Sequence, residues 1–345
     1  MDYTSLTQPG NNVEDNTRSI LKGVIFQFVG QGVLKVGIAS ELYNTDITFR
    51  STLERCDKFV KANRKHGILE LLYPNENDLT TQNLLQETQY AQPILVSIEC
   101  SLADMLKSKG IYPEAVLGHS IGEYAACYSA GLFTLEDCLK LVCERGRLTE
   151  ENLKCRGVMA ALRATPETIL KAIETSGQKN FTSLAAVNGH QSVVLSGDAE
   201  STDRVLKELN GVSHRMLNVK NAFHSPLMEC ILPEYSEILN SIQFKTPSSK
   251  IFSTVKGVEY SDSIRTTEYW LDHITGTVHY KSAVESAWNA GLRNFIEIGP
   301  DNTLSALSRT VITSLNARNG LKPASINDGK WLSGLNPEMK PADFF

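Results

Sequence analysis

The pentapeptide Gly118-His119-Ser120-Ile121-Gly122 combines residue types and spacing that suit covalent chemistry. Glycines two residues before and two residues after a serine permit a sharp turn from a strand into a helix. Residues 115–117 read as a short apolar strand, and residues 123–127 read as a helix of small side chains. Such a turn would expose the hydroxyl of Ser120 beside the N–H groups of a helix N-terminus, which can stabilise an oxyanion. The pattern therefore predicts a nucleophilic serine.

A serine hydroxyl requires a neighbouring base at neutral pH. The sequence offers seven histidines, namely His66, His119, His190, His214, His224, His273 and His279. His119 is adjacent to Ser120, and because neighbours on a tight turn point apart, we expect it to line the pocket. His224 lies in a loop that opens a helix, where functional residues concentrate. It is a candidate base, but residue types alone leave the other histidines open.

The elements around these residues indicate an α/β architecture. A β-type run at residues 23–28 ends in the glycine turn at 30–32, and residues 295–300 form a second buried strand. Apolar residues recur at helical spacing over 92–107, and a helix follows Thr134. We predict a hydrolase-like core with a parallel sheet and a strand-turn-helix nucleophile elbow.

The pattern of expected elements changes between residues 157 and 219, where strands and helices should follow one another in the order β-α-β-β-α-β. That order is typical of a ferredoxin-like α+β subdomain, here inserted into the larger core. The predicted organisation is a disordered lead at 1–20, an α/β core at 21–156 and 220–315, the ferredoxin-like subdomain at 157–219, and a linker-like tail at 316–345.

Composition excludes several classes of protein. Of the 345 residues, 41% are hydrophobic and 21% are charged, which is typical of a globular chain. The net charge of −5 offers no cationic surplus for nucleic acid. Seven cysteines with no C-x-x-C pair predict reduced thiols and neither a metal site nor a disulfide framework. Without a secretory signal or a long apolar run, we expect a cytoplasmic protein that contacts neither membrane nor nucleic acid.

The motifs together resemble the malonyl-CoA:acyl-carrier-protein acyltransferase family. The family includes discrete transacylases and the acyltransferase domains of polyketide and fatty-acid synthases. The resemblance rests on residues 28–32, 92–93, 118–126, 131–137, 145–148, 186–188, 196–197, 222–228, 269–273 and 297–300. These motifs occur in the family's order over about residues 22–312.

The resemblance implies a role for each catalytic residue. Ser120 would be acylated, and His224 would take its proton and return it to the departing thiol. A backbone carbonyl near His273 would orient the imidazole in place of an acidic third member. The side chain of Gln31 and the N–H of Ile121 would form the oxyanion hole.

The resemblance also implies how the acyl group is held. Arg145 would clamp the free carboxylate of a malonyl group, for which a planar guanidinium is suited. Without the resemblance, Arg145 would read as an exposed helix arginine near Glu144 and Glu150. Phe223 before the histidine would crowd an α-methyl branch, which favours malonyl. The expected substrate-binding residues are Arg145, His119, Phe223, Asn188 and His273.

The implied reaction is the transfer of a malonyl or related group from CoA to the phosphopantetheine thiol of an acyl carrier protein, in polyketide or fatty-acid synthesis. No bound cofactor is expected, because acyl-CoA is the donor substrate and the partner carries the phosphopantetheine. The enzyme would act in trans, unless the chain is a domain of a longer synthase with a ketosynthase.

Two other classes remain open. An editing acyl hydrolase of the same family would pass the acyl group to water, whereas an α/β-hydrolase thioesterase would need an acid such as Asp198 or Asp203 and a later histidine. An inert docking domain is the non-enzymatic alternative.

Overall fold

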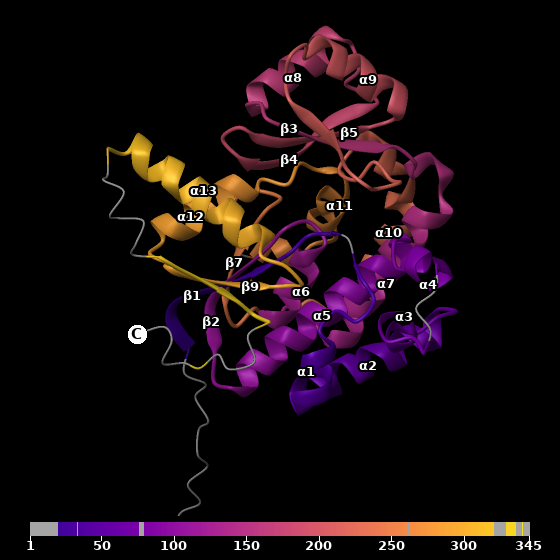
Figure 1. The fold of residues 1–345 in the computed structure, drawn as a ribbon, viewed down its shortest axis with the longest axis vertical. Helices are drawn as coiled ribbons and strands as arrows, with labels where there is room; N and C mark the ends of the chain where they lie inside the picture. The colour runs from indigo at the N-terminus through magenta and orange to yellow at the C-terminus, as the bar shows by residue number, and fades with distance from the viewer. Residues whose placement is uncertain are drawn as a thin grey trace, which may run out of the picture.

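The computed structural model describes residues 20–32, 34–75, 79–260, 262–320, 329–335 and 340, which form two β-sheets with helices packed around them (Figure 1). The strands in this part of the chain are β1 (Ile20–Phe28), β2 (Tyr112–Gly118), β3 (Val158–Leu162), β4 (Thr182–Gly189), β5 (Ser192–Gly197), β6 (His214–Met216), β7 (Lys250–Ser253), β8 (Val258–Tyr260), β9 (Asn294–Ile298) and β10 (Lys330–Ser333).

The larger sheet has the strand order β10-β9-β1-β2-β7-β8. Its first five strands are parallel neighbours, and β8 is antiparallel to β7 at one edge. In β1, every residue from Val24 to Phe28 is buried. A parallel strand reads as a continuous apolar run because both faces of its sheet are covered. The α/β class predicted from the sequence is confirmed.

Helices pack around the two sheets (Figure 1). They are α1 (Ser40–Thr45), α2 (Ile47–Asn63), α3 (Ile68–Leu72), α4 (Leu79–Leu84), α5 (Thr88–Ser108), α6 (Gly122–Ser129), α7 (Leu135–Glu151), α8 (Pro166–Thr175), α9 (Ala199–Glu208), α10 (Leu232–Leu239), α11 (Thr267–Thr275), α12 (Tyr280–Asn289) and α13 (Thr303–Arg318), with short 3₁₀ helices η1 (Leu153–Cys155), η2 (Pro226–Ile231) and η3 (Asp262–Arg265). α5 packs against α2, α6 and α7, and this helical group lies at the lower right of Figure 1.

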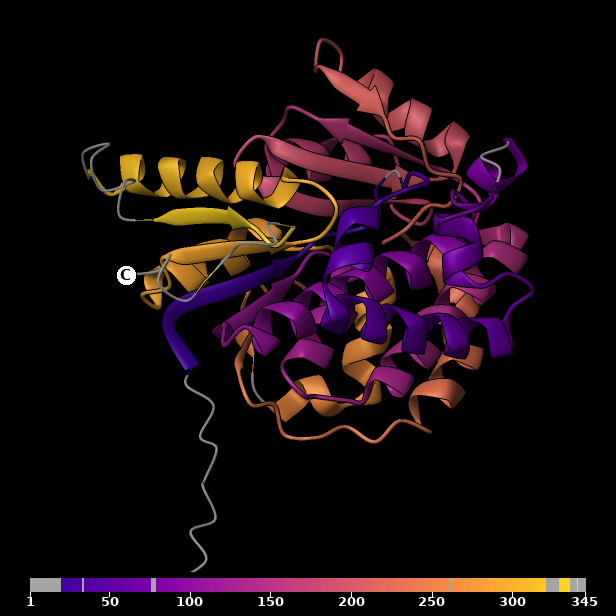
Figure 2. The ribbon, with the colours of Figure 1, turned by 60° about the horizontal axis from the view of Figure 1, so that its bottom comes forward.

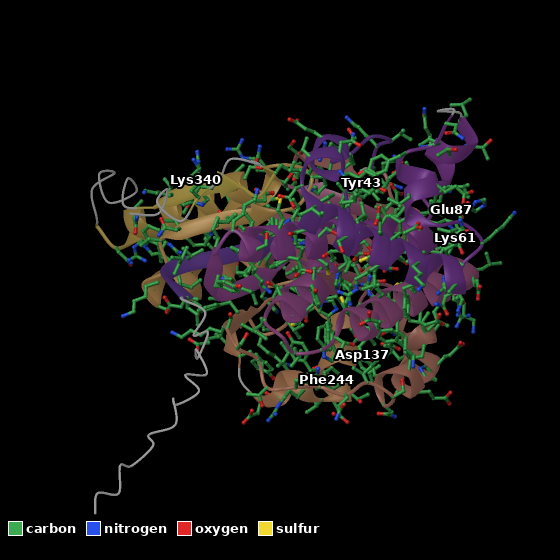
Figure 3. The ribbon with its side chains drawn as sticks, turned by 90° about the horizontal axis from the view of Figure 1, so that it is seen from below. Tyr43, Lys61, Glu87, Asp137, Phe244 and Lys340 are labelled. Carbon is green, nitrogen blue, oxygen red and sulfur yellow. The ribbon has the colours of Figure 1, made fainter. Side chains whose placement is uncertain are left out.

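Local sequence explains the helices that position the site. The side chain of Thr134 accepts a hydrogen bond from the N–H of Asp137 at 3.1 Å and so caps the N-terminus of α7. α6 packs against both β1 and β2, and its small buried residues permit that close approach. The ring of Phe244, labelled in Figure 3, stacks on Trp270 of α11 with centroids 6.5 Å apart. The ring of Tyr124, on α6, lies 4.6 Å from that of Trp270, and this contact anchors α11 beside α6.

The smaller sheet comprises β3 to β6 in the order β4-β5-β3-β6, with α8 and α9 between its strands in the chain. This is the strand order of a ferredoxin-like split β-α-β unit, and it lies at the top of Figure 1. One face has its own core with α8 and α9, while Ala186 and Val194 belong to the core of the larger domain. The inner face of the small sheet therefore covers the larger domain.

The tail differs from the expected linker. α13 continues to Arg318, and Lys330–Ser333 forms β10, which pairs in parallel with β9 (Figure 2). The ring of Trp331 stacks near Phe295 and Trp288, which explains why so short a run is held on the sheet. The predicted lead at 1–20 lies outside the described residues except for Ile20, which begins β1, and so do residues 321–328, 336–339 and 341–345 of the tail. None of the described helices is long and apolar enough to span a membrane.

Candidate active site

Ser120 lies on the turn that joins β2 to α6, with a left-handed φ of 52°. Non-glycine residues rarely adopt this conformation, because it costs about 1–2 kcal/mol. The flanking glycines make the turn possible. A Cβ at Gly118 would lie 2.2 Å from the Cα of Glu123, and a Cβ at Gly122 would lie 2.3 Å from the carbonyl oxygen of Val29. The Gly-x-Ser-x-Gly spacing is therefore required by close packing.

The hydroxyl of Ser120 meets the ring of His224, with 2.6 Å between Oγ and Nε2. The other ring nitrogen, Nδ1, donates to the carbonyl of Gly276 at 2.9 Å. Because a carbonyl can only accept, the proton of neutral His224 resides on Nδ1, and Nε2 is free to accept the serine proton. Burial, followed by the positive charge of Arg145, holds the pKa of His224 well below its usual range. His224 is therefore an unprotonated base at neutral pH.

Hydrogen bonds on both sides hold the loop that carries His224. The N–H of Ala222 donates to the carbonyl of Cys155 at 2.9 Å, and the hydroxyl of Ser225 donates to the carbonyl of Ala222 at 2.6 Å. The hydroxyl of Ser183, on β4, donates to the carbonyl of His224 itself. These contacts fix His224 at a left-handed φ of 58°, the same rare region that Ser120 occupies.

The ring of His273 contacts the backbone of Ser120. Its Nε2 donates to the backbone carbonyl of Ser120 at 3.0 Å, and its buried Nδ1 has no hydrogen-bond partner among the described residues. Burial and the charge of Arg145 lower the pKa of His273 to about 3, so the ring is neutral. It does not line the cavity in front of Ser120. The backbone carbonyl that was expected near His273 to orient His224 is that of Gly276. The side chain of His273 was expected to contact substrate, but it supports the turn at Ser120 instead.

Arg145 is 1% exposed on α7, yet its Nε and Nη2 have no hydrogen-bond partner among the described residues. The acidic neighbours suggested by the sequence are engaged elsewhere. Glu144 pairs with Arg64 and Arg147, and Glu150 pairs with Arg156. Burial of a guanidinium without a counter-ion costs desolvation free energy. An anionic ligand in the cavity could offset that cost.

Arg145 and the Ser120–His224 pair face one cavity of about 600 Å³. The guanidinium carbon of Arg145 lies 5.7 Å from the centre of the Phe223 ring, and both residues line this cavity. The described residues that line the cavity and bear on its chemistry are Gln31, Gln92, His119, Ser120, Ile121, Arg145, Asn188, Phe223 and His224.

The groups predicted for the oxyanion hole also lie at this cavity. Ile121 precedes the first turn of α6, where backbone N–H groups lack partners within the helix. The side-chain oxygen of Gln31 accepts from Nε2 of Gln92 at 3.1 Å, which leaves the amide group of Gln31 as a donor. Gln92 belongs to one of the motifs but has no role predicted from the sequence, and the structure places it as the partner that orients Gln31.

His119 and Asn188 form a pair on the opposite wall. Nε2 of His119 lies 2.8 Å from Oδ1 of Asn188, and burial lowers the pKa of His119. Gly30 is required next to this pair, because a Cβ there would lie 2.7 Å from Nδ1 of His119. No group of histidine, cysteine or acidic side chains in the described part of the chain is arranged to hold a metal ion.

Comparison with known sequences gives matches along most of the chain. Residues 25–331 match the family model described as "Acyl transferase domain". The polyketide synthase GfsB of Streptomyces halstedii is 36% identical over 290 residues, which cover 82% of this chain and 5% of that protein. The PKS-NRPS hybrid synthetase acdB of Aspergillus candidus is 31% identical over 313 residues, 90% of this chain and 12% of that protein. The chain thus spans a small part of each relative.

Solved structures share the fold. The acyltransferase domain from the second module of the salinomycin polyketide synthase superposes with a TM-score of 0.79 at 29% identity, covering 93% of this chain and 71% of that chain. MCAT from Streptococcus pneumoniae superposes with a TM-score of 0.78 at 22% identity, covering 90% and 95%, and this likeness concerns the fold. The chain belongs to the acyl transferase domain family.

Proposed function

We propose that the chain transfers a malonyl group from CoA to the phosphopantetheine thiol of an acyl carrier protein, through an ester on Ser120. The observation that carries this proposal is the buried guanidinium of Arg145, whose Nε and Nη2 lack a partner among the described residues and which faces the same cavity as the Ser120–His224 pair. A dicarboxylic monothioester presents a reactive carbonyl at one end and a carboxylate at the other. It therefore suits both features at once, whereas a simple fatty acyl group would leave the charge of Arg145 unpaired.

In the first half-reaction, His224 Nε2 accepts the proton of Ser120 as Oγ attacks the thioester carbonyl. The carbonyl of Gly276 stabilises the imidazolium that forms, because it accepts from Nδ1. The N–H of Ile121 and the amide of Gln31 stabilise the oxyanion, and a donor of this kind contributes about 3–4 kcal/mol. The tetrahedral intermediate then expels the CoA thiolate, which takes the proton from His224.

In the second half-reaction, the carrier thiol enters the same cavity. His224 accepts the thiol proton, and the sulfur attacks the ester carbonyl on Ser120. Collapse of the intermediate releases the acylated carrier and returns the proton to Oγ. The chain itself needs no resident cofactor in this scheme, since the phosphopantetheine arrives on the partner. The printed names of relatives as polyketide synthases support assembly of polyketides as the setting.

Phe223 is the residue we propose as the determinant of acyl choice. Its ring is 93% buried, lies beside Arg145 and directly precedes His224 in the chain. An α-methyl branch on the malonyl group would compete with this ring for space. One methyl group in a pocket changes binding by about 1–3 kcal/mol, so the expected preference for malonyl over methylmalonyl is roughly 10–200-fold.

Intact-protein mass spectrometry after brief exposure to malonyl-, methylmalonyl- and acetyl-CoA tests the proposal. We expect a malonyl adduct that peptide mapping places on Ser120, that is absent from Ser120→Ala, and that moves to a phosphopantetheine-loaded carrier protein when one is added. Ser241→Ala, a surface serine paired with Lys140, is the matched control and should label like the wild type.

Three outcomes would count against the proposal. A malonyl adduct that persists in Ser120→Ala would refute the assignment of the nucleophile. Equal labelling by all three thioesters would refute the role of Phe223. Release of the adduct to water with no transfer to any carrier would indicate the editing hydrolase.

A further inference from the structure

Two cysteines that the catalytic scheme does not use lie in contact. Sγ of Cys155 is 3.0 Å from Sγ of Cys230, although the residues are 75 positions apart in the chain. Cys155 is fully buried, whereas Cys230 is partly exposed. Both are free thiols in this structure, as are the other five cysteines, which are all buried.

The pair lies at the base of the loop that carries His224. Cys155 ends η1, directly after α7, and its carbonyl accepts from the N–H of Ala222. Cys230 lies on η2, and its thiol donates to the carbonyl of Leu227 at 3.1 Å. The two ends of the segment 222–230 therefore meet at Cys155, the first through a backbone hydrogen bond and the second through the sulfur contact.

We propose that Cys155 and Cys230 form a redox-active dithiol, which a low-molecular-weight disulfide such as glutathione disulfide converts to an intramolecular disulfide in the folded protein. A disulfide bond is about 2.05 Å long, so the two sulfurs must approach by about 1 Å. We expect rotation of the two side chains to supply that movement. The bond would close a covalent loop of the chain from Cys155 to Cys230, and this loop includes the segment that carries His224.

The chemistry proceeds by two exchanges. The partly exposed Cys230 loses its proton, and its sulfur attacks one sulfur of the oxidant, which yields a mixed disulfide and one free thiol. The sulfur of Cys155 then loses its proton and attacks Sγ of Cys230, which expels the second thiol. Two protein thiols are oxidised, and the oxidant is reduced to two thiols. Burial and the contact with Cys230 raise the pKa of the Cys155 thiol, so ring closure should accelerate at alkaline pH.

We expect the disulfide to restrict the movement of the loop that carries His224. The covalent loop includes Ala222, the strained His224 and Ser225, and it adds a covalent restraint to the hydrogen bonds that now fix this loop. A cross-link that spans many residues stabilises mainly by restricting the unfolded chain. The inference concerns the thiols alone and does not depend on which acyl group the site transfers.

The test is incubation of the reduced, folded protein with glutathione disulfide, followed by alkylation, intact mass and peptide mapping. The wild type should lose the mass of two hydrogen atoms and yield a Cys155–Cys230 linked peptide. Its melting temperature should rise by roughly 5 °C. Cys155→Ser should instead keep one glutathionyl group on Cys230, and Cys230→Ser should keep none. Cys143→Ala, which removes a buried thiol from α7, is the matched control and should behave like the wild type.

Three results would overturn the proposal. One is a wild type that retains a stable glutathionyl group on Cys230, because ring closure would then fail. Another is a wild type that does not react while Cys155→Ser also stays unmodified. The third is a linked peptide accompanied by a fall in melting temperature, since the disulfide would then distort the native fold.

Discussion

Replacing Arg145 by methionine should make the protein more stable and nearly inactive with malonyl-CoA. The guanidinium is 1% exposed, and two of its nitrogen atoms have no partner among the described residues, so the folded protein without ligand carries an uncompensated charge. Substituting buried charges by apolar side chains of similar volume is often stabilising by about 1–4 kcal/mol. Because Arg145 faces a cavity that water reaches, we expect the lower end of that range.

The loss of activity follows from the same nitrogen atoms. A carboxylate bound to Nε and Nη2 would make two charge-assisted hydrogen bonds, each of about 1.5–3 kcal/mol. Removing both hydrogen bonds should cost at least about 3 kcal/mol of transition-state stabilisation with malonyl-CoA. This loss corresponds to a fall in kcat/KM of roughly 100-fold. Transfer of an acetyl group makes no use of this carboxylate site and should persist.

The assay pairs urea unfolding with transfer rates for malonyl- and acetyl-CoA. Arg147→Met is the matched control on the same helix, because Arg147 is partly exposed and pairs with Glu144, Glu151 and Glu234. It should lose a little stability and keep its preference for malonyl. The reasoning would be refuted if Arg145→Met unfolded more easily than the wild type and lost acetyl and malonyl transfer alike, since Arg145 would then be a structural residue.

Three further predictions concern the histidines and a buried acid. The charge of Arg145 lowers the pKa of His224, so Arg145→Met should raise that pKa. The acid limb of the pH–rate profile for acetyl transfer should therefore shift to higher pH, and an unchanged profile would contradict this. His273→Ala should reduce kcat by roughly 10-fold while KM holds, and His273→Gln should recover most of it, because an amide N–H can still donate to the Ser120 carbonyl; equal losses would show a packing role only. Burial raises the pKa of Glu123 from 4.5 to about 7, so the folded state holds a proton that the unfolded state releases. Stability should fall by about 3 kcal/mol as pH rises from 4.5 to 7, and Glu123→Gln should flatten that dependence in urea unfolding.

Residue types singled out Ser120 as a candidate nucleophile because the turn that bears it imposes a local requirement. Gly118 and Gly122 each approach neighbouring backbone so closely that a Cβ would not fit. Such a requirement leaves a signature within five residues of sequence. The parallel sheet was predictable for a similar reason, since the segment Val24–Phe28 is buried throughout and apolar at every position except Gln27.

The base and its partner were much less accessible to sequence reasoning. His224 was one of seven histidines until the resemblance to the family singled it out. The carbonyl of Gly276, which orients His224, is a backbone atom and therefore leaves no trace in residue type. The contact of His273 with Ser120 and the sulfur contact of Cys155 with Cys230 join residues far apart in the chain, so only the fold reveals them.

The strand β10 shows why short elements are hard to predict from the local sequence. Lys330–Ser333 has four residues between segments rich in glycine and proline, a composition that favours a linker. Its place on the sheet depends on the backbone of β9 and on stacking of Trp331 with Phe295. Neither partner is adjacent in the sequence, so the local pattern predicted the wrong state.

The sharpest test of transfer through Ser120 is a crystal structure of the protein trapped after brief exposure to malonyl-CoA. We expect an ester at Oγ of Ser120, with the malonyl carboxylate within hydrogen-bond distance of Nε and Nη2 of Arg145, the two nitrogen atoms that lack partners among the described residues. An acyl group on any other residue, or a carboxylate turned toward solvent while Arg145 stays unpaired, would contradict it.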